Sequence, residues 1–367
     1  MNDQLFNSIC NKETLYTAWI RVKEKNTTGG IDFLTVQDYA VTADQNLEEL
    51  VYQLQSGNYI QQPYREVMIP KNEHEKRRLG LLTVNDKIVQ TAVSLVVTPI
   101  IEQGFLKVSY AYRENKGAVK AINQVRHLIT NERYTWLAAC DIDNFFDTIP
   151  HDALFGKLSA YLKSPATTEL IRMFVKMGRV DRHYHWKDSH KGIPQGGVVS
   201  PLLANFYLYP LDKLMVDHGY GFVRYADDFV ILGRTEEEAK KAMTGAMEVI
   251  TRQLGLALNE EAVVIPTSKG FEFLGIYFNN GQIDLSEKKY KRLVEKMADA
   301  AGFGQGLITP KLKETLQGIA NFYARLVPQE KLEKLDNELI AILRLRSEAL
   351  KIGKTKKGAV LEQLRTL

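Results

Sequence analysis

The stretch "GFVRYADDFVILG", residues 221–233, places two adjacent carboxylates, Asp227 and Asp228, between two runs of strand-forming residues. Phenylalanine, valine, isoleucine and tyrosine favour strands, so the two runs predict a hairpin. Short hairpin turns normally carry Asn-Gly or Asp-Gly, which adopt the positive φ angles that such turns need. Two acids side by side at the tip of an apolar hairpin repel each other, which indicates a cation that neutralises them.

A third acid, Asp141, is predicted at the end of another strand, in "YTWLAACDIDNFF". It lies 86 residues before Asp227, so the two acids meet only if their strands are neighbours in one sheet. Alternate side chains of a regular strand point to opposite faces, but a turn at Ala226 and Asp227 relaxes that limit. We expect Asp227 to be the closer partner of Asp141. Two divalent metals held by such acids stabilise both oxygens of an in-line phosphoryl displacement, so the acids predict nucleotidyl transfer.

The rest of the chain predicts an α+β domain followed by a helical appendage. Ser200 is expected to cap a helix whose first residue is Pro201. The expected elements are helices at 12–24, 46–57, 84–103, 117–130, from near 150, from 200 and at 235–255, strands at 64–70, near 136–141 and at 256–265, a hairpin at 270–285 with Asn-Gly at its tip, and three helices after Ser286.

The composition, with 45% hydrophobic and 25% charged residues, is that of an ordinary globular protein. Cys10 and Cys140 form neither a disulfide framework nor a zinc-binding pair, so we expect plain thiols. No leader peptide and no apolar run of about 18 residues is evident, which predicts a cytoplasmic protein without a membrane partner.

The net charge is +4, but its distribution is uneven. From Ser286 onward the chain carries 17 Lys and Arg against 10 Asp and Glu, an excess of +7, so the preceding part carries −3. Two readings stay open: a solvated helical face with the Lys-rich tail "KIGKTKK", or a surface that follows a nucleic-acid backbone.

Four motifs occur in the order "ACDIDNFFDTIPH", "GIPQGGVVSPLLANFYL", "VRYADDFVIL" and "GFEFLGIYF". This order resembles the palm of reverse transcriptases, most closely those of bacterial group II introns, and the resemblance covers about residues 12–350. It implies a right-hand polymerase fold in which an α-helical thumb follows fingers and a palm built on an antiparallel sheet with helices. The implied domains are an N-terminal extension with fingers at 1–135, a palm with finger-like insertions at 136–284, and a thumb with a basic tail at 285–367.

The resemblance also implies roles for individual residues. Asp141, the carbonyl of Ile142, Asp227 and Asp228 would hold two Mg²⁺ ions, with Mn²⁺ as an alternative. The remaining roles concern the substrates: Phe146 would exclude the ribose 2′-hydroxyl, Gln195 and Gly196 would lie under the incoming nucleotide, Lys71 and Arg77 would hold its triphosphate, and Leu274 and Gly275 would position the primer end. The neighbours Lys76 and Arg78 leave the triphosphate assignment uncertain by one position.

One position departs from the family pattern. Related enzymes commonly carry a Lys after this hairpin that helps to protonate the leaving pyrophosphate, but "LNEEAVVI" has Ala262 there. The sequence therefore predicts either a slow polymerase or one whose acid is Lys269, the nearest lysine along the chain. The histidines of "RHYHWKDSH", His183, His185 and His190, crowd together, but nothing in the resemblance calls for a metal there.

The resemblance implies an RNA-directed DNA polymerase that copies an RNA template from a DNA or RNA primer with dNTPs. Neither DNA-binding nor endonuclease segments are evident after the thumb, so a stand-alone enzyme is expected, serving a retroelement, CRISPR spacer acquisition or phage defence. Further partners would be a structured non-coding RNA or a Cas1-type integrase. Two alternatives compete: a non-catalytic, maturase-like RNA-binding protein, disfavoured by the three intact acids, and an RNA-dependent RNA polymerase, disfavoured by Phe146.

Overall fold

The computed structural model describes residues 3–70, 75–259, 262–302 and 308–350. Its helices are α1 (Gln4–Ile9), α2 (Lys12–Lys25), α3 (Val36–Val41), α4 (Ala43–Ser56), α5 (Val84–Glu102), α6 (Ala118–Thr130), α7 (Phe145–Thr148), α8 (His151–Leu162), α9 (Pro165–Lys176), α10 (Ser200–Asp217), α11 (Glu236–Glu248), α12 (Glu287–Gly302), α13 (Pro310–Tyr323) and α14 (Gln329–Leu350), with a π-helix η1 (Val249–Gln253) and a 3₁₀ helix η2 (Thr267–Lys269). Its strands are β1 (Tyr64–Pro70), β2 (Lys76–Leu81), β3 (Trp136–Ala139), β4 (Arg179–Val180), β5 (Trp186–Lys187), β6 (Gly221–Tyr225), β7 (Asp228–Gly233), β8 (Val263–Pro266), β9 (Phe271–Phe273), β10 (Ile276–Asn279) and β11 (Gln282–Asp284).

The chain folds into two compact units. Unit 1 comprises residues 1–116, 138–231 and 240–263, and unit 2 comprises 117–137, 232–239 and 264–367. The division runs through β3, β7, β8 and α11, so both units contain pieces that are distant in sequence.

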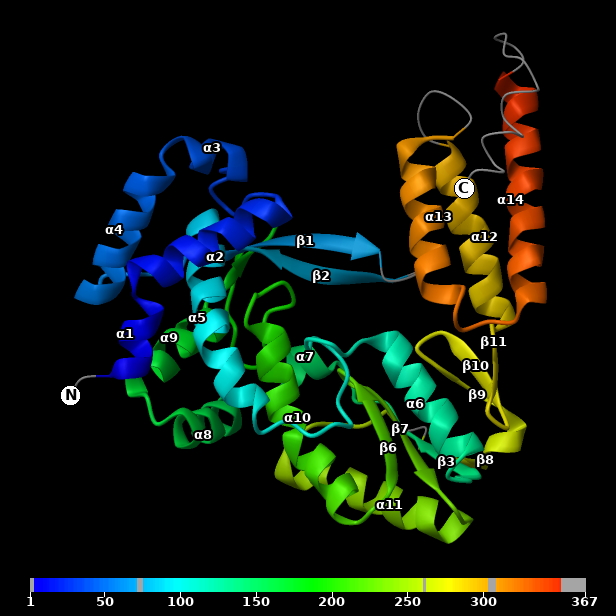
Figure 1. The fold of residues 1–367 in the computed structure, drawn as a ribbon. Coiled ribbons are helices and arrows are strands. Elements are labelled where there is room, and N and C mark those ends of the chain that lie inside the picture. Colours follow the sequence, from blue (N-terminus) through cyan, green and yellow to red (C-terminus); the bar gives the residue numbers. More distant parts are fainter. Residues whose placement is uncertain (1–2, 71–74, 260–261, 303–307, 351–367) are drawn as a thin grey trace. The chain divides into compact units, whose positions relative to one another are not determined.

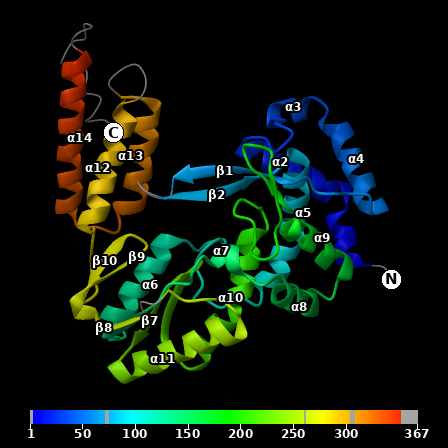
Figure 2. The same cartoon turned by 180° about the vertical axis from the view of Figure 1, so that it is seen from behind.

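The centre of unit 1 is helix α5, against which α2 packs (Figures 1 and 2). Thr83 caps α5 by accepting a hydrogen bond from the Asp86 amide at 3.2 Å. By length and composition α5 is the one helix in the described part of the chain that could cross a membrane, but 61% of its 18-residue apolar window is buried inside the protein. Its apolar side chains therefore serve the core of the unit.

One sheet of unit 1 has the strand order β2-β1-β4-β5. Strands β1 and β2 pair antiparallel from Arg65 opposite Leu81 to Pro70 opposite Lys76. Strand β4 joins β1 in parallel, with Tyr64 opposite Arg179, and turns back into β5.

A second sheet has the order β6-β7-β3-β8. Asp141 follows β3, and Asp227 immediately precedes β7. These two strands are neighbours in the sheet, as the hypothesis of a shared acidic site requires. Isolated bridges from Ser109 to Arg224 and from Ile142 to Leu258 continue the pairing beyond the named strands.

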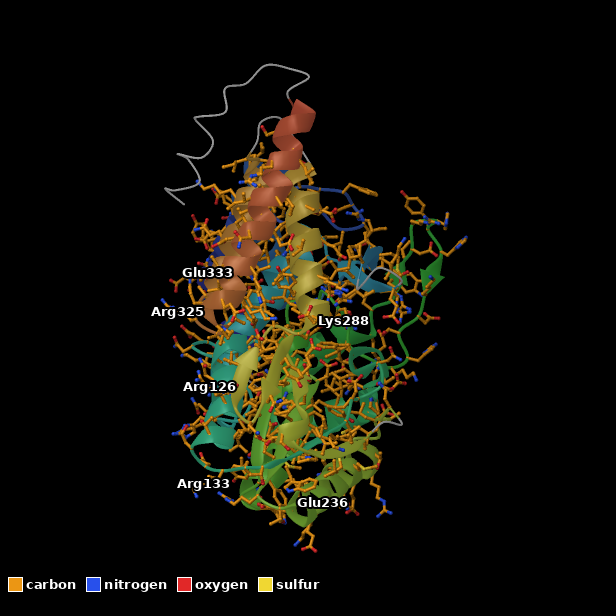
Figure 3. All side chains as sticks on the ribbon, turned by 90° about the vertical axis from the view of Figure 1, so that its right-hand side faces the viewer. Arg126, Arg133, Glu236, Lys288, Arg325 and Glu333 are labelled. Atoms are coloured by element: carbon orange, nitrogen blue, oxygen red, sulfur yellow. The ribbon has the colours of Figure 1, made fainter. Side chains whose placement is uncertain are left out.

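Unit 2 contains a three-stranded sheet, β11-β10-β9, and a bundle of α12, α13 and α14 that lie side by side (Figures 1 and 2). The bundle buries Ala300, Ala301, Leu312 and Leu343 in a common core. Its outer faces are charged, and exposed side chains on this unit include Arg126, Lys288 and Arg325 (Figure 3).

Most of the expected elements are confirmed, including the buried helix α5, the hairpin with Asn280 and Gly281 between β10 and β11, and the three final helices. Two details are wrong. Ser200 is the first helical residue rather than the cap: Val199 holds the cap position, no side chain accepts a capping bond there, and the Ser200 hydroxyl donates to the carbonyl of Pro194 at 2.7 Å. The strand expected at 256–265 is confined, in its described part, to β8 and the bridge at Leu258.

Candidate active-site cleft

A cleft of about 960 Å³ opens in unit 1, and polar side chains from β2, the β3–α7 loop, the loop before α10 and the β6–β7 turn line it. The cleft collects seven of the predicted site residues: Arg77, Asp141, Ile142, Phe146, Gln195, Gly196 and Asp227. Asp228 is exposed at the start of β7 and does not line the cleft. Leu274 and Gly275 belong to unit 2, and Lys71 lies outside the described residues.

Asp227 lies in a tight two-residue turn. Ala226, the other turn residue, adopts a φ of +58°, and β7 begins at Asp228. An alanine in the left-handed region is strained unless its surroundings hold it there.

A buried arginine supplies that restraint. Arg224 is completely buried, and its guanidinium donates to the carbonyl of Ala226 at 2.9 Å. The same guanidinium binds both carboxylate oxygens of Asp212 on α10 at 2.6 Å and donates to Asn205 at 2.9 Å. Burial raises the pKa of the Asp212 carboxyl, and the ion pair with Arg224 offsets part of that rise. This bidentate pair fixes the backbone immediately before Asp227.

Asp141 is held by Asn259, whose side-chain amide donates to the Asp141 carboxylate at 2.8 Å. The Asn259 backbone amide also donates to the Asp141 carbonyl at 3.0 Å. The antiparallel bridge between Ile142 and Leu258 adds a third link between the two segments. The orientation of Asp141 therefore depends on the loop that follows η1.

The donor set of the cleft suits a hard divalent cation, because it offers the carboxylates of Asp141 and Asp227 and the carbonyl of Ile142. Within the described ranges, no three His, Cys, Asp or Glu side chains gather closely enough to hold a metal ion together. The cleft thus brings two of the three predicted acids to one place.

Phe146 lines the cleft beside Phe145, and their rings meet edge to face with centroids 5.3 Å apart. Phe145 is fully buried, as expected for a core aromatic. The backbone carbonyl of Phe146 accepts from the amide of Ile193 at 2.7 Å, which fixes Phe146 against the loop that contains Gln195.

The backbone conformation and the close surroundings of Gly196 both require glycine at this position. Its φ is +109°, and a Cβ atom would overlap the carbonyl oxygen of Gly80 on β2. Next to it, the Gln195 carbonyl accepts from the Gly80 amide at 2.7 Å. This close approach joins the loop before α10 to β2.

The basic strand β2 presents two arginines to the cleft. Arg78 forms an ion pair with Asp147 at 2.8 Å, whereas Arg77 has no ion pair among the described residues. Tyr112 also lines the cleft at a φ of +60°; burial raises the pKa of its phenol, and the charge of Asp227 raises it further.

Leu274 and Gly275 form the turn between β9 and β10, with φ angles of +52° and +75°. A Cβ at Gly275 would lie 3.3 Å from the Lys289 ammonium nitrogen. Burial and the neighbouring charge of Arg292 lower the pKa of Lys289.

Two residues concern the lysine that this chain lacks after the β6–β7 hairpin, and they belong to different units. Ala262, at the position of that lysine, is exposed in unit 1, and Lys269, the alternative acid, is exposed in unit 2.

The sequence reasoning missed Arg224, Asp212 and Asn259. The signal for Arg224 lies in the opening motif, because an arginine between Phe222, Val223 and a further apolar run has no solvated face to occupy. No comparable signal marks Asn259, whose partner is remote in sequence.

A family model described as reverse transcriptase (RNA-dependent DNA polymerase) matches residues 69–278. The group II intron-encoded protein LtrA of Lactococcus lactis subsp. cremoris is 33% identical over 175 residues, which cover 47% of this chain and 29% of LtrA. The protein YkfC of Escherichia coli (strain K12) is 29% identical over 286 residues, which cover 68% of this chain and 75% of YkfC.

Among solved structures, telomerase from Candida albicans, in complex with a fragment of telomeric RNA, is similar with a TM-score of 0.50. It is 10% identical and covers 85% of this chain and 60% of that chain, so the likeness concerns the fold alone. The chain spans less than a third of LtrA, the relative with the higher identity.

The family model covers more than half of the chain, and its span includes β2 to β9 and every residue that lines the cleft except Met68. Reverse transcriptases depend on divalent metal ions, in agreement with the oxygen donors of the cleft. The chain belongs to the reverse transcriptase family.

Proposed function

We propose that this protein is an RNA-directed DNA polymerase that extends a DNA or RNA primer on an RNA template with dNTPs. The observation that supports it is the joint lining of one cleft by Asp141, Asp227 and Phe146. Two acids in such a place hold a metal-bound nucleotide, and an aromatic beside them selects its sugar.

The proposed cofactor is a pair of Mg²⁺ ions, which Mn²⁺ can replace. Asp141, Asp227 and the carbonyl of Ile142 hold the ions, and Asp228 joins them. Metal ions held there would neutralise the charge that develops on the transferred phosphoryl group.

The protein's own groups bind and orient the substrates. Arg77 and Lys71 hold the triphosphate, and the absence of a described ion pair at Arg77 supports its assignment over Arg78, which is engaged with Asp147. Gln195 and Gly196 lie under the nucleotide, Phe146 excludes the 2′-hydroxyl, and Leu274 and Gly275 position the primer end.

We propose the division into an N-terminal extension with fingers at 1–135, a palm with finger-like insertions at 136–284, and a helical thumb with a basic tail at 285–367. The enzyme acts in the cytoplasm for a retroelement, CRISPR spacer acquisition or phage defence, together with a structured non-coding RNA or a Cas1-type integrase. The group II intron-encoded relatives support the retroelement lineage.

Primer extension tests the proposal directly. We expect the protein to extend a primer on an RNA template with dNTPs and Mg²⁺, to stop when the metal is chelated, and to resume when Mg²⁺ or Mn²⁺ is restored. Tight RNA binding without extension under all metal conditions would instead favour the maturase-like alternative.

A further inference from the structure

The hairpin of β4 and β5 carries an unusual run of exposed residues. Residues 182–188, "RHYHWKD", are all exposed, with Tyr184 exposed by 70% and Trp186 by 53%. From Arg179 to Lys191 the chain carries four Lys and Arg against two Asp, besides three histidines. Exposed aromatic rings interleaved with cations are the usual composition of a surface that binds single-stranded nucleic acid.

The exposed rings stand on a rigid base. The carboxylate of Asp181 accepts from the amides of His183 and His185 at 2.8 and 3.1 Å, which closes the turn. These backbone bonds are the main cause that lowers the Asp181 pKa to about 2. Lys187 bridges Asp181 and Glu66 on β1 at 3.4 and 3.5 Å, so the acids at the base are matched by cations.

Trp186 is held in a fixed orientation with one face free. Its indole nitrogen donates to Asp188 at 2.6 Å, and its ring packs so closely on Gly178 that a Cβ there would overlap it. The ring is nevertheless half exposed, so it presents its outer face to solvent. A fixed ring loses little conformational entropy when a base stacks on it.

The foot of the hairpin leads into a groove that is lined by charges of both signs. A cavity of about 700 Å³ is lined by Lys176, His190 and Lys191, with Asp152 and Asp188 beside them. Ser189 and Lys191 also line a smaller cavity with Gln195, a residue of the active-site cleft. The hairpin, the groove and the cleft therefore form a continuous series of surfaces within unit 1.

We propose that this aromatic hairpin, residues 179–191, binds single-stranded RNA, with bases stacked on Trp186 and Tyr184 and phosphates near Arg182, Lys176 and Lys191. Duplexes keep their bases stacked on each other, so free rings favour an unpaired strand. The inference rests on the proposed function in one respect: the strand is the unpaired part of the template.

The test compares the binding of primer–template duplexes that differ only in their template overhang. Fluorescence anisotropy would measure affinity for a duplex with a minimal overhang and for one with a uridine-rich overhang of about 16 nucleotides. We expect the wild type to prefer the long overhang, and Trp186→Ala with Tyr184→Ala to lose about 5- to 150-fold of that affinity for each base no longer stacked. Tyr184→Phe, which keeps the ring, should bind as the wild type does.

Tyr52→Ala is the matched control, because Tyr52 is an exposed tyrosine on α4, with 63% of its surface accessible. It should leave the preference intact. Overturning results are an unchanged overhang preference in the double variant, an equal loss in Tyr52→Ala, or a preference seen only with DNA overhangs.

Extension on the minimal overhang separates this inference from the proposed function. The hairpin variants should extend that substrate at the wild-type rate, which would show that they fold and that the active site is intact. If the wild type itself fails to extend, the proposed function fails, whereas the overhang preference still tests the hairpin.

Discussion

Arg224 has two roles: it neutralises the buried Asp212 and it restrains the backbone before Asp227. Removing one partner of a buried pair leaves the other charge unsatisfied, at a cost of about 3–5 kcal/mol. Replacing both partners by apolar residues often restores stability. The two tasks can therefore be separated by mutation.

We predict that Arg224→Met with Asp212→Leu unfolds near the wild-type denaturant midpoint but extends primers about 100-fold more slowly, because the Ala226 carbonyl has lost its donor. The single variant Arg224→Met should lose both stability and activity. Urea unfolding and single-turnover extension would measure the two effects. A stable double variant with wild-type kcat would refute the positioning role.

Phe146 and Phe145 form a matched pair for testing sugar selection. We predict that Phe146→Val raises the kcat/KM for ribonucleotides relative to deoxyribonucleotides by about 10-fold or more, because the smaller side chain admits a 2′-hydroxyl. Phe145→Leu, at a buried core position, should lower the unfolding free energy and leave sugar discrimination unchanged. Equal effects of both substitutions would place the selection elsewhere.

The first turn of helix α5 contains a buried acid that couples folding to pH. Asp86 accepts hydrogen bonds from the Tyr59 hydroxyl at 2.7 Å and the Thr83 hydroxyl at 2.6 Å. Burial outweighs these bonds and raises the Asp86 pKa from 3.8 to about 6. The folded state therefore keeps a proton that the unfolded state has already released.

This difference in proton binding sets the direction in which stability changes with pH. Because the folded state binds the proton more tightly, the stability contributed by Asp86 is present below about pH 4 and is lost as the pH rises to about 6. We predict that Asp86→Asn, which does not titrate, gains up to about 3 kcal/mol relative to the wild type between these pH values. Urea unfolding of both proteins at each pH would measure it, and a constant difference would contradict the raised pKa.

The elements that the sequence could predict are those with strong local signals. Helix α5, the β6–β7 hairpin and the Asn-Gly turn at 280–281 each have a clear period or turn motif. The two-residue strands β4 and β5 have none, because β4 pairs with β1, more than 100 residues away, and β5, among the described strands, pairs only with β4. Ser200 illustrates a different limit, since the helix begins one residue earlier than the Ser-Pro pair predicts and the Ser200 hydroxyl bonds the preceding loop at Pro194.

The candidate site divides in the same way. The three acids and Phe146 could be predicted because they lie within short contiguous motifs that occur in a characteristic order along the chain. Asn259 and Arg224 were not, because their roles arise from contacts with Asp141 and Asp212 that the motif itself does not contain. Asp228, expected as a metal ligand, stays a prediction, because it does not line the cleft with the other two acids.

At the scale of the whole molecule, the positive excess after Ser286 bears on nucleic-acid binding. Five of its Lys and Arg residues, against one Glu, fall in residues 351–367, outside the described part. We predict that affinity for a primer–template duplex falls linearly in log K against log salt, and that Lys288→Gln and Lys291→Gln each reduce the slope by about 1. Glu333→Gln, which removes an exposed acid of α14, is the control (Figure 3).

Binding titrations at several salt concentrations would measure these slopes. Unaltered slopes in both lysine variants, or an equal reduction in Glu333→Gln, would indicate that these lysines belong to a solvated helical face that does not bind nucleic acid.

Single-turnover extension by Asp227→Asn tests directly whether the cleft joins nucleotides, because the substitution keeps the size of the side chain but removes the charge proposed to bind metal. Wild-type and variant protein would be compared on the same RNA template, with duplex affinity measured in parallel. We expect extension to fall below detection while affinity for the duplex stays within a few fold of the wild type. Extension at the wild-type rate would contradict it, because the cleft of Asp141 and Asp227 would then not be the place where the chain joins nucleotides.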